Sequence, residues 1–190
     1  MRVCCNRSVP NCLLIVTGAP LASRCTDIAA ALKEAGWRVQ VVTTPAADAW
    51  VDDATISTVS GQPAVGEHRD PGEAKRSEAP DAVVVAPATF NTIGKAALGI
   101  ADTYAHSQLC EAIGSGLPIV MVPMLNNKLW GHPALPGHLQ TLIAAGVSFV
   151  DPQTGDDSPA PVTSGTGDQV VRDFEPSWIV AKLEQLNPSL

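Results

Sequence analysis

Short apolar runs that alternate with helical segments constrain this chain more than any other feature of its sequence. The clearest run covers residues 81–86 (DAVVVA), and its length and uniform hydrophobicity are typical of a strand buried on both faces. Runs of strand character also occupy residues 12–16, 37–43, 118–122 and 147–150. Because helical segments lie between most of these runs, the sequence predicts an open, mostly parallel α/β sheet with helices on both faces.

Most of the predicted helices end near glycines, which are common helix stop signals. They cover residues 27–33, 93–98, 102–113, 138–145 and 177–186. Two weaker features are a short helix at residues 46–50 and an edge strand at residues 55–59. Residues 60–80 are polar and rich in glycine and proline, so we expect a loop there.

The length of 190 residues suits one domain of ordinary size. We expect residues 1–11 to be a disordered lead-in and residues 12–190 to form that single domain. After residue 150 the composition becomes polar, which predicts a flexible flap at residues 151–170 before the last helix.

Composition excludes several classes of partner. The net charge is −7 and only 16% of the residues are charged, which argues against a nucleic-acid surface and against an anionic-membrane surface. No apolar run approaches the roughly 18 residues that a membrane span requires. The hydrophobic fraction of 45% favours a folded globule over a disordered chain.

Five cysteines are present, without a C-x-x-C pair or a Cys/His spacing typical of zinc, so we predict no metal site. They are Cys4, Cys5, Cys12, Cys25 and Cys110. Reduced thiols favour a cytoplasmic location. The alternative is secretion, because Arg2 and Arg7 precede an apolar stretch at residues 13–16, as in a signal peptide. Thr17 and Gly18 break that stretch, which argues against secretion.

Polar loops follow four of the predicted strands and would meet at one edge of the sheet, where open α/β folds bind ligands. They cover residues 17–20, 43–44, 87–92 and 123–127. Hydroxyl groups and backbone N–H groups can hold a phosphate without lysine or arginine, so the loops favour a phosphate-bearing cofactor. Neither a G-x-G-x-x-G nor a Walker A motif is present. The alternatives are that Gly18 serves only a tight turn and that Asn91 is only a helix cap.

Two of these segments resemble the motifs of a known family. Residues 87–95 (PATFNTIGK), followed by residues 99–102 (GIAD), resemble the P-A-S-A-N-T motif and the helix after it. Residues 123–130 (PMLNNKLW) resemble the P-x-M-N-x-x-M-W motif. On these motifs, residues 12–152 are similar to the homo-oligomeric flavin-containing cysteine decarboxylases, which include phosphopantothenoylcysteine decarboxylases and lantibiotic peptidyl-cysteine decarboxylases.

The resemblance implies a Rossmann-like, flavodoxin-type doubly wound parallel sheet in three layers, α/β/α. It also implies FMN bound at a subunit interface of a homotrimer or homododecamer. The substrate would be a small molecule or a peptide with a carboxylate. In the family a cysteine thiol is oxidised to a thioaldehyde, and carbon dioxide is then lost to give an enethiol.

The matched motif positions imply two sets of site residues. The cofactor-binding set comprises Thr17, Gly18, Ala19, Thr43, Thr89, Phe90 and Asn91. The substrate-binding set comprises Met124, Leu125 and Asn126. In the family, the asparagine at the position of Asn126 binds the substrate carboxylate, which makes Asn126 the leading catalytic candidate here.

The chain also departs from the family pattern. The family's catalytic histidine lies 14 residues before the first motif, where this chain has Glu73, and His68 lies further upstream as the other candidate. Phe90 replaces a small residue, and Leu125 replaces the motif methionine. The candidate flap at residues 161–167 lacks the cysteine of the enzymes that re-reduce the enethiol. The resemblance therefore implies a reaction that stops at the oxidised enethiol.

The remaining histidines and one pair of charges have less specific roles. His106 and His138 fall on predicted helices, where we expect surface or capping roles. His132 follows the second motif closely enough to line a pocket. Lys95 and Asp102 lie at helical spacing after the first motif, where we expect a structural or interface role.

Two alternative functions stay open at this level. The first is a flavoprotein of the same fold with a different redox or lyase reaction, such as a prenyl-flavin synthase. Those enzymes bind dimethylallyl phosphate through basic residues that are not found in this sequence. The second is a non-catalytic flavin-binding subunit, although related inhibitory subunits carry long acidic tails that this sequence lacks.

Overall fold

The computed structural model describes residues 9–68, 72 and 79–187. Its centre is a sheet of five parallel strands in the order β2-β1-β3-β4-β5. The strands are β1 (Asn11–Val16), β2 (Arg38–Thr43), β3 (Ala82–Ala88), β4 (Ile119–Pro123) and β5 (Val147–Phe149). Each strand matches a run predicted from the sequence. A strand that is covered on both faces of the sheet needs apolar side chains on both faces, and this makes it recognisable as a continuous apolar run.

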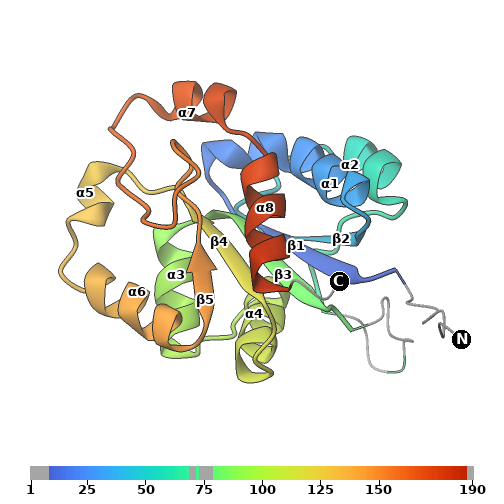
Figure 1. Ribbon diagram of the computed structural model, residues 1–190, viewed down its shortest axis with the longest axis horizontal. Coiled ribbons are helices and arrows are strands. Elements are labelled where there is room, and N and C mark those ends of the chain that lie inside the picture. The colour runs from blue at the N-terminus through green and yellow to red at the C-terminus, as the bar shows by residue number, and fades with distance from the viewer. Residues whose placement is uncertain (1–8, 69–71, 73–78, 188–190) are drawn as a thin grey trace, which may run out of the picture.

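Helices cover both faces of the sheet (Figure 1). One face carries α1 (Cys25–Glu34), α2 (Asp53–Ser60) and α8 (Ser177–Leu186). The other face carries α3 (Phe90–Leu98), α4 (Tyr104–Gly114) and α6 (Leu135–Ala144). Three shorter helices lie beyond the carboxyl ends of the strands, namely η1 (Pro20–Arg24), α5 (Asn127–Trp130) and α7 (Gly167–Asp173). The three-layer, doubly wound flavodoxin-type fold is therefore confirmed.

Side chains of the central strands alternate between two hydrophobic cores. Leu14 and Val84 pack into the core beneath α1 and α8, whereas Ile15 and Val85 pack into the core beneath α3, α4 and α6. All four are essentially inaccessible to solvent. Full burial of one such side chain contributes about 1.5–3 kcal/mol, so both faces of the sheet hold the layers together.

The predicted edge strand at residues 55–59 is wrong, because this segment lies within helix α2. Asp52 caps the helix by accepting a hydrogen bond from the N–H of Thr55, and Gly61 ends it in the left-handed region at φ 84°. β-Branched residues suggested a strand, but a strong cap at each end and one buried residue, Ile56, favour a helix.

Other elements also differ from the prediction. The predicted helix at residues 46–50 is wrong, because the segment forms successive turns, with the N–H of Trp50 donating to the carbonyl of Ala47. Helix α3 begins at Phe90 rather than at residue 93. Helix α7 begins at Gly167, inside the segment predicted as a flexible flap.

The ends of the chain fall partly outside this structure. Residues 1–8 of the predicted lead-in lie outside the described residues, and strand β1 already includes Asn11. Within the described part of the chain, no helix is long and apolar enough to cross a membrane.

Candidate functional site

The loops after β1, β3 and β4 meet at the carboxyl edge of the sheet, next to the point where the strand order reverses. A cleft of about 740 Å³ opens there. A smaller cavity of about 370 Å³ adjoins it, and Gly18, Thr89 and Asn91 line both. The edge predicted from the sequence therefore does carry a concave site.

The buried hydroxyl of Thr17 joins two of these loops. Its Oγ1 donates a hydrogen bond to the carbonyl oxygen of Pro87 (2.8 Å) and accepts one from the N–H of Thr89 (3.2 Å). The loop after β1 and the loop after β3 are thereby held in one fixed arrangement.

Gly18 allows the loops after β1 and β2 to touch. A Cβ atom at this position would lie 2.4 Å from the carbonyl oxygen of Ala46, which is closer than real contacts allow. The N–H of the next residue, Ala19, donates to the carbonyl of Thr17 (2.9 Å). Ala19 therefore lines the cleft with its N–H already engaged.

The start of helix α3 is capped by Thr89, not by Asn91. Thr89 Oγ1 accepts a hydrogen bond from the N–H of Thr92 (3.3 Å), as an N-cap residue does. Asn91 is exposed, and its side chain is free to face the cleft and the cavity that it lines. Phe90 lines the cleft and packs edge-on against His132, with ring centroids 5.2 Å apart.

Asn126 serves two purposes at the end of β4. Its Oδ1 accepts hydrogen bonds from the N–H groups of Lys128 (3.0 Å) and Leu129 (2.9 Å) and so caps helix α5. Among the described residues, no hydrogen bond involves Asn126 Nδ2, and Asn126 lines the cleft. The amide N–H₂ is therefore the part of this side chain that can donate to a ligand.

The two residues before Asn126 are buried beneath the cleft that they line. The Sδ of Met124 accepts a hydrogen bond from the N–H of Leu21 (3.2 Å), which ties this loop to helix η1. Leu125 is 1% exposed, and its carbonyl accepts from the N–H of Val162 (2.9 Å). Both side chains supply apolar floor rather than polar contacts.

The segment predicted as a flap lies over the cleft and is bound to the Asn126 loop. Val162 bridges to Asn126, and its carbonyl accepts from the N–H of Asn127 (3.1 Å). Ser164 donates to Asn127 Oδ1 through both its N–H (3.1 Å) and its hydroxyl (2.8 Å). Residues 162–165 therefore form one wall of the cleft.

Several sequence-predicted residues lie away from both cavities. His68 is exposed and packs edge-on against Tyr104, with ring centroids 5.3 Å apart, and it lines neither cavity. Thr43 is buried and lines neither, whereas its neighbour Thr44 lines the small cavity. Glu73 lies outside the described residues.

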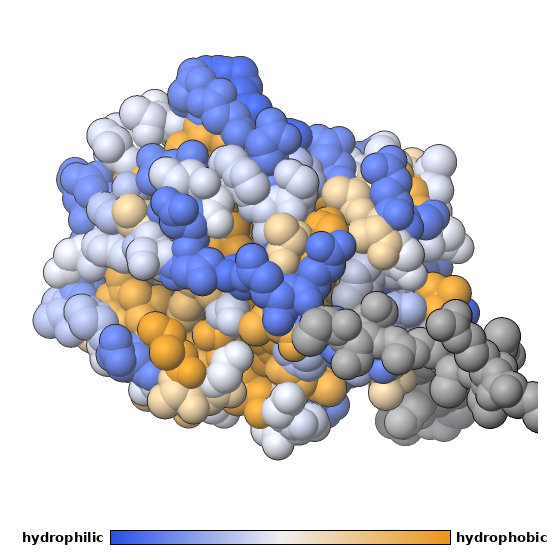
Figure 2. All heavy atoms as spheres, in the orientation of Figure 1, coloured by the Kyte–Doolittle hydropathy of each residue, from blue (hydrophilic) through white to orange (hydrophobic). Residues whose placement is uncertain are grey.

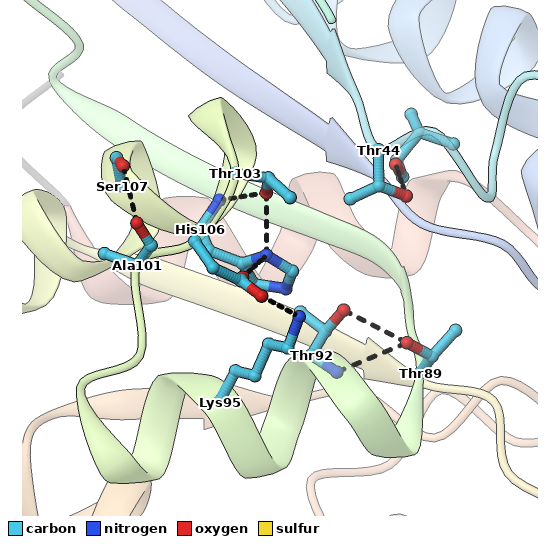
Figure 3. Close-up of polar contacts among 10 residues, drawn as sticks. Thr44, Thr89, Thr92, Lys95, Ala101, Thr103, His106 and Ser107 are labelled. Carbon is cyan, nitrogen blue, oxygen red and sulfur yellow. Dashed lines mark hydrogen bonds and ion pairs between the residues drawn. The ribbon is translucent and has the colours of Figure 1, made fainter. Parts of the chain in front are cut away.

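A cluster of polar side chains lies at the small cavity (Figure 3). The motif segments include Lys95 and Asp102 but not Thr103 or His106. Lys95 donates to Asp102 Oδ2 at 2.6 Å. The prediction of a surface role for His106 is wrong, because only 3% of this residue is exposed. Its Nδ1 lies 2.7 Å from Thr103 Oγ1 and 3.4 Å from Asp102 Oδ1. Its Nε2 is buried without a hydrogen-bond partner among the described residues.

Two pKa values in this cluster are shifted. The hydrogen bond from Lys95 holds the pKa of the Asp102 carboxyl below its ordinary value of 3.8. Burial, and then the charge of Lys95, lower the pKa of His106 below its ordinary value of 6.5, and Asp102 only partly opposes this. At neutral pH, His106 is therefore a neutral imidazole.

Sequence reasoning missed Trp50 and Asp168, which also line the main cleft. Pro20 and Leu129 line it too, and lie in segments that were predicted without being named as site residues. Trp50 is the most informative of them, because a tryptophan that is 43% exposed beside a cleft is a common ligand contact. The one signal in the sequence is that Trp50 is an aromatic residue in a chain with only 4% aromatic residues.

The chain resembles known proteins over most of its length. Coenzyme A biosynthesis bifunctional protein CoaBC of Vibrio vulnificus (strain YJ016) is 28% identical over 179 residues, covering 91% of this chain and 42% of that protein. CoaBC of Bacillus subtilis (strain 168) is 30% identical over 156 residues, covering 76% of this chain and 36% of that protein. The chain therefore spans less than half the length of these relatives.

Solved structures share the fold, and a family model matches the sequence. The FMN-dependent cysteine decarboxylase SpaF superposes with a TM-score of 0.68 at 24% identity, covering 90% of this chain and 97% of that one. A PPC decarboxylase mutant complexed with pantothenoylaminoethenethiol gives a TM-score of 0.70 at 19% identity, covering 96% and 100%. The family model described as Flavoprotein matches residues 5–169. The protein therefore belongs to the Flavoprotein family.

Proposed function

We propose that this protein binds FMN and catalyses the oxidative decarboxylation of a small molecule or peptide that carries a cysteine-type carboxylate. The observation that carries the proposal is the geometry of Asn126. Its Oδ1 is committed to the helix cap, so its Nδ2 can only donate, and a donor in a cleft suits a carboxylate. The similarity to CoaBC proteins and the likeness to cysteine decarboxylase structures support the same reaction class.

The residues at the carboxyl edge fit FMN. The cleft has the size of an ordinary cofactor site. Phe90, Trp50 and Met124 offer apolar surface for a flat ring, and the hydroxyl-bearing threonines beside Gly18 suit the polar remainder. A Cβ at Gly18 would collide with the backbone of Ala46, so this glycine lets the loops after β1 and β2 pack together at the cofactor edge. When bound, FMN would supply a two-electron acceptor for oxidation of the thiol.

The protein's own contribution would be to hold and enclose the substrate. Asn126 Nδ2 would fix the carboxylate by a hydrogen bond, so that the bond to the departing carbon dioxide keeps one orientation. The wall formed by residues 162–165 would exclude water, which weakens solvation of the carboxylate and favours its loss. The flap has no cysteine, so the enethiol would leave without being reduced.

Replacement of Asn126 by aspartate tests this proposal sharply. An aspartate oxygen still caps α5, but it places a negative charge where the amide donor stood. We expect normal folding and flavin absorbance, with kcat/KM for a cysteine-terminated peptide lowered at least about tenfold. Activity is read by mass spectrometry as loss of carbon dioxide and two hydrogens. Unchanged activity in the Asn126→Asp variant would overturn the assignment.

A second candidate is a flavin-binding protein without decarboxylase activity. The position of His68 favours it, because this residue packs on Tyr104 and lines neither cavity. The two candidates separate when thiol peptides are added to the flavin-loaded protein without oxygen. Bleaching of the visible flavin absorbance supports the enzyme, and unchanged absorbance with every thiol supports the binding protein.

We also propose that the chain assembles as a homotrimer or homododecamer, as a single domain whose flap at residues 151–170 closes on substrate. Exposed apolar side chains support assembly, with Leu98 65%, Ile143 51% and Ile100 42% exposed. Hydrophobic side chains gather over α6 in Figure 2. A UbiX-like FMN-dependent decarboxylase of Escherichia coli O157:H7, which shares the fold, is dodecameric.

We also propose a cytoplasmic location, which the free thiols at the described cysteines support.

A further inference from the structure

The small cavity is lined by a histidine, one of whose buried ring nitrogens has no partner among the described residues. His106 is 3% exposed, and its Nε2 makes no hydrogen bond among the described residues although it lines this cavity. Buried polar atoms are nearly always satisfied, so an exception at a cavity needs an explanation, and a ligand that completes the hydrogen bond is one. The cavity shares Gly18, Thr89 and Asn91 with the main cleft, so one extended ligand can reach both.

The surroundings of His106 decide which kind of ligand atom would satisfy Nε2. On the other side of the ring, Nδ1 faces Thr103 Oγ1 and the Asp102 carboxylate, which favour a proton on Nδ1. Nε2 then carries a lone pair and needs a donor. Lys95 also lines the cavity, but its ammonium group is engaged with the Asp102 carboxylate, so the pair as a whole carries no net charge.

Among the described residues, Lys95 and His106 are the titratable side chains that line the cavity, and its other lining residues carry no charge. The loops after β1 and β2 contribute Thr17, Thr44 and Ala46, and the start of α3 contributes Thr89 and Thr92. His68 and Tyr104, at this end of α4, pack against each other, and neither lines the cavity. A neutral acceptor among hydroxyls suits a hydroxylated chain better than a phosphate or a carboxylate.

We propose that the small cavity binds the polyhydroxylated chain of the flavin and that His106 Nε2 positions it by accepting a hydrogen bond from a hydroxyl group. This inference rests on flavin binding at the adjoining cleft. In this arrangement His106 is a positioning residue, and groups other than His106 bind the phosphate of FMN. Burial and Lys95 keep the imidazole neutral, which preserves the acceptor at physiological pH.

Three flavins separate the possibilities in a fluorescence-quenching titration. Lumiflavin has the ring alone, riboflavin adds the hydroxylated chain, and FMN adds the phosphate. For the His106→Ala variant we expect the Kd of riboflavin and of FMN to rise about three- to tenfold, with no change for lumiflavin. His106→Gln places an amide oxygen near Nε2 and should restore most of the affinity. Equal effects on all three flavins would overturn the proposal.

The pH dependence gives a second readout with a definite sign. Protonation converts Nε2 from an acceptor to a donor. Because the pKa of His106 lies below 6.5, riboflavin affinity should stay constant above about pH 6.5 and fall below it in the native protein. The fall should disappear in His106→Gln, which does not titrate. Asp102 stays ionised over this range because its pKa is depressed. Tighter binding of FMN at low pH, without an effect on riboflavin, would show phosphate recognition and overturn the proposal.

A matched control comes from helix α6. His138 also has a buried nitrogen without a partner among the described residues, its Nδ1, but it lies beside Gly94 and lines neither cavity. His138→Gln should leave all three affinities and their pH dependence unchanged. If no flavin binds to the native protein, the proposed function fails. If all three bind and His106→Ala matches the native protein, only this inference fails.

Discussion

At the scale of single residues, the site depends on side chains that each satisfy a structural need and leave one group for a ligand. Asn126 caps α5 with its oxygen and keeps its N–H₂. Thr89 caps α3 and lines both cavities. Gly18 contributes by the absence of a side chain, because Ala46 occupies the space.

Gly18→Ala should destabilise the fold and weaken flavin binding together. The new methyl group would overlap the Ala46 carbonyl, and because backbone cannot move aside cheaply, we expect a loss of about 1–3 kcal/mol in unfolding free energy. Gly137→Ala is the control, since a Cβ there meets nothing within 4 Å and lies in helix α6, where alanine is favoured by up to about 1 kcal/mol. Urea unfolding measures the unfolding free energy of both variants. Equal values would contradict the close approach of Gly18 to Ala46.

His106 also predicts how stability depends on pH. Its pKa is lower in the folded state, so the unfolded chain binds more protons below pH 6.5. The unfolding free energy should therefore fall as the pH drops from about 6.5 towards 5. Asp52 and Asp102 have pKa values below 3.8 and contribute only at lower pH. The urea midpoint, measured at several pH values, should depend less on pH in His106→Gln than in the native protein. An unchanged dependence on pH would show that His106 is not its cause.

Only part of the site could be predicted residue by residue. Gly18, Thr89 and Asn126 belong to loops that a short sequence motif or a strand end reveals. His106 and Trp50 depend on tertiary packing, because nothing near them in sequence indicates that α4 lies beside the loop after β2, or that residues 45–50 reach the cleft. His68 illustrates the converse, since proximity in sequence to the motif did not place it at a cavity.

At the scale of elements, the apolar strands were predictable and the polar connections were not. Strands buried on both faces form short, nearly continuous apolar runs, and their length and flanking turn residues distinguish them from helices. Helix α2 was missed because its stability comes from Asp52 and Gly61 at its ends rather than from its interior. Helix α7 was missed because Gly167 opens it and Val170 is its only buried residue.

The flap is the element whose attachment can be tested most directly. Asn127→Ala removes the acceptor of both hydrogen bonds from Ser164, so residues 163–165 should exchange amide hydrogens faster. The substrate KM should rise by up to about tenfold, while flavin affinity changes little. Lys128→Ala, at the exposed neighbouring position, is the control. Unaltered exchange at Ser164 would mean that Asn127 does not hold the flap.

At the scale of the whole molecule, the exposed apolar residues on α3 and α6 matter most. Leu98 and Ile143 lie near the C-terminal ends of two helices that pack against each other. In the proposed assembly they would be covered by a neighbouring subunit, which would contribute free energy in proportion to the apolar area removed from water.

Sedimentation velocity tests that assembly. The native chain should sediment as a homotrimer or a larger multiple of three, and a Leu98→Glu, Ile143→Glu double variant should shift towards the monomer. The matched double variant Lys33→Glu, Glu34→Lys changes exposed residues on α1 without changing net charge or removing apolar surface, and should keep the native mass. A monomeric native chain would contradict the proposed assembly.

The hydroxyl of Thr17 has a consequence for the kinetics of cofactor loading. It ties the loops after β1 and β3 together without help from any ligand, through bonds to Pro87 and Thr89. Because both bonds lie within the chain, the proposed flavin would meet these two loops already held together. The association rate constant of the flavin would then be set by diffusion and by access past the flap. Differences in flavin affinity among relatives of this chain should therefore lie mainly in the dissociation rate constant.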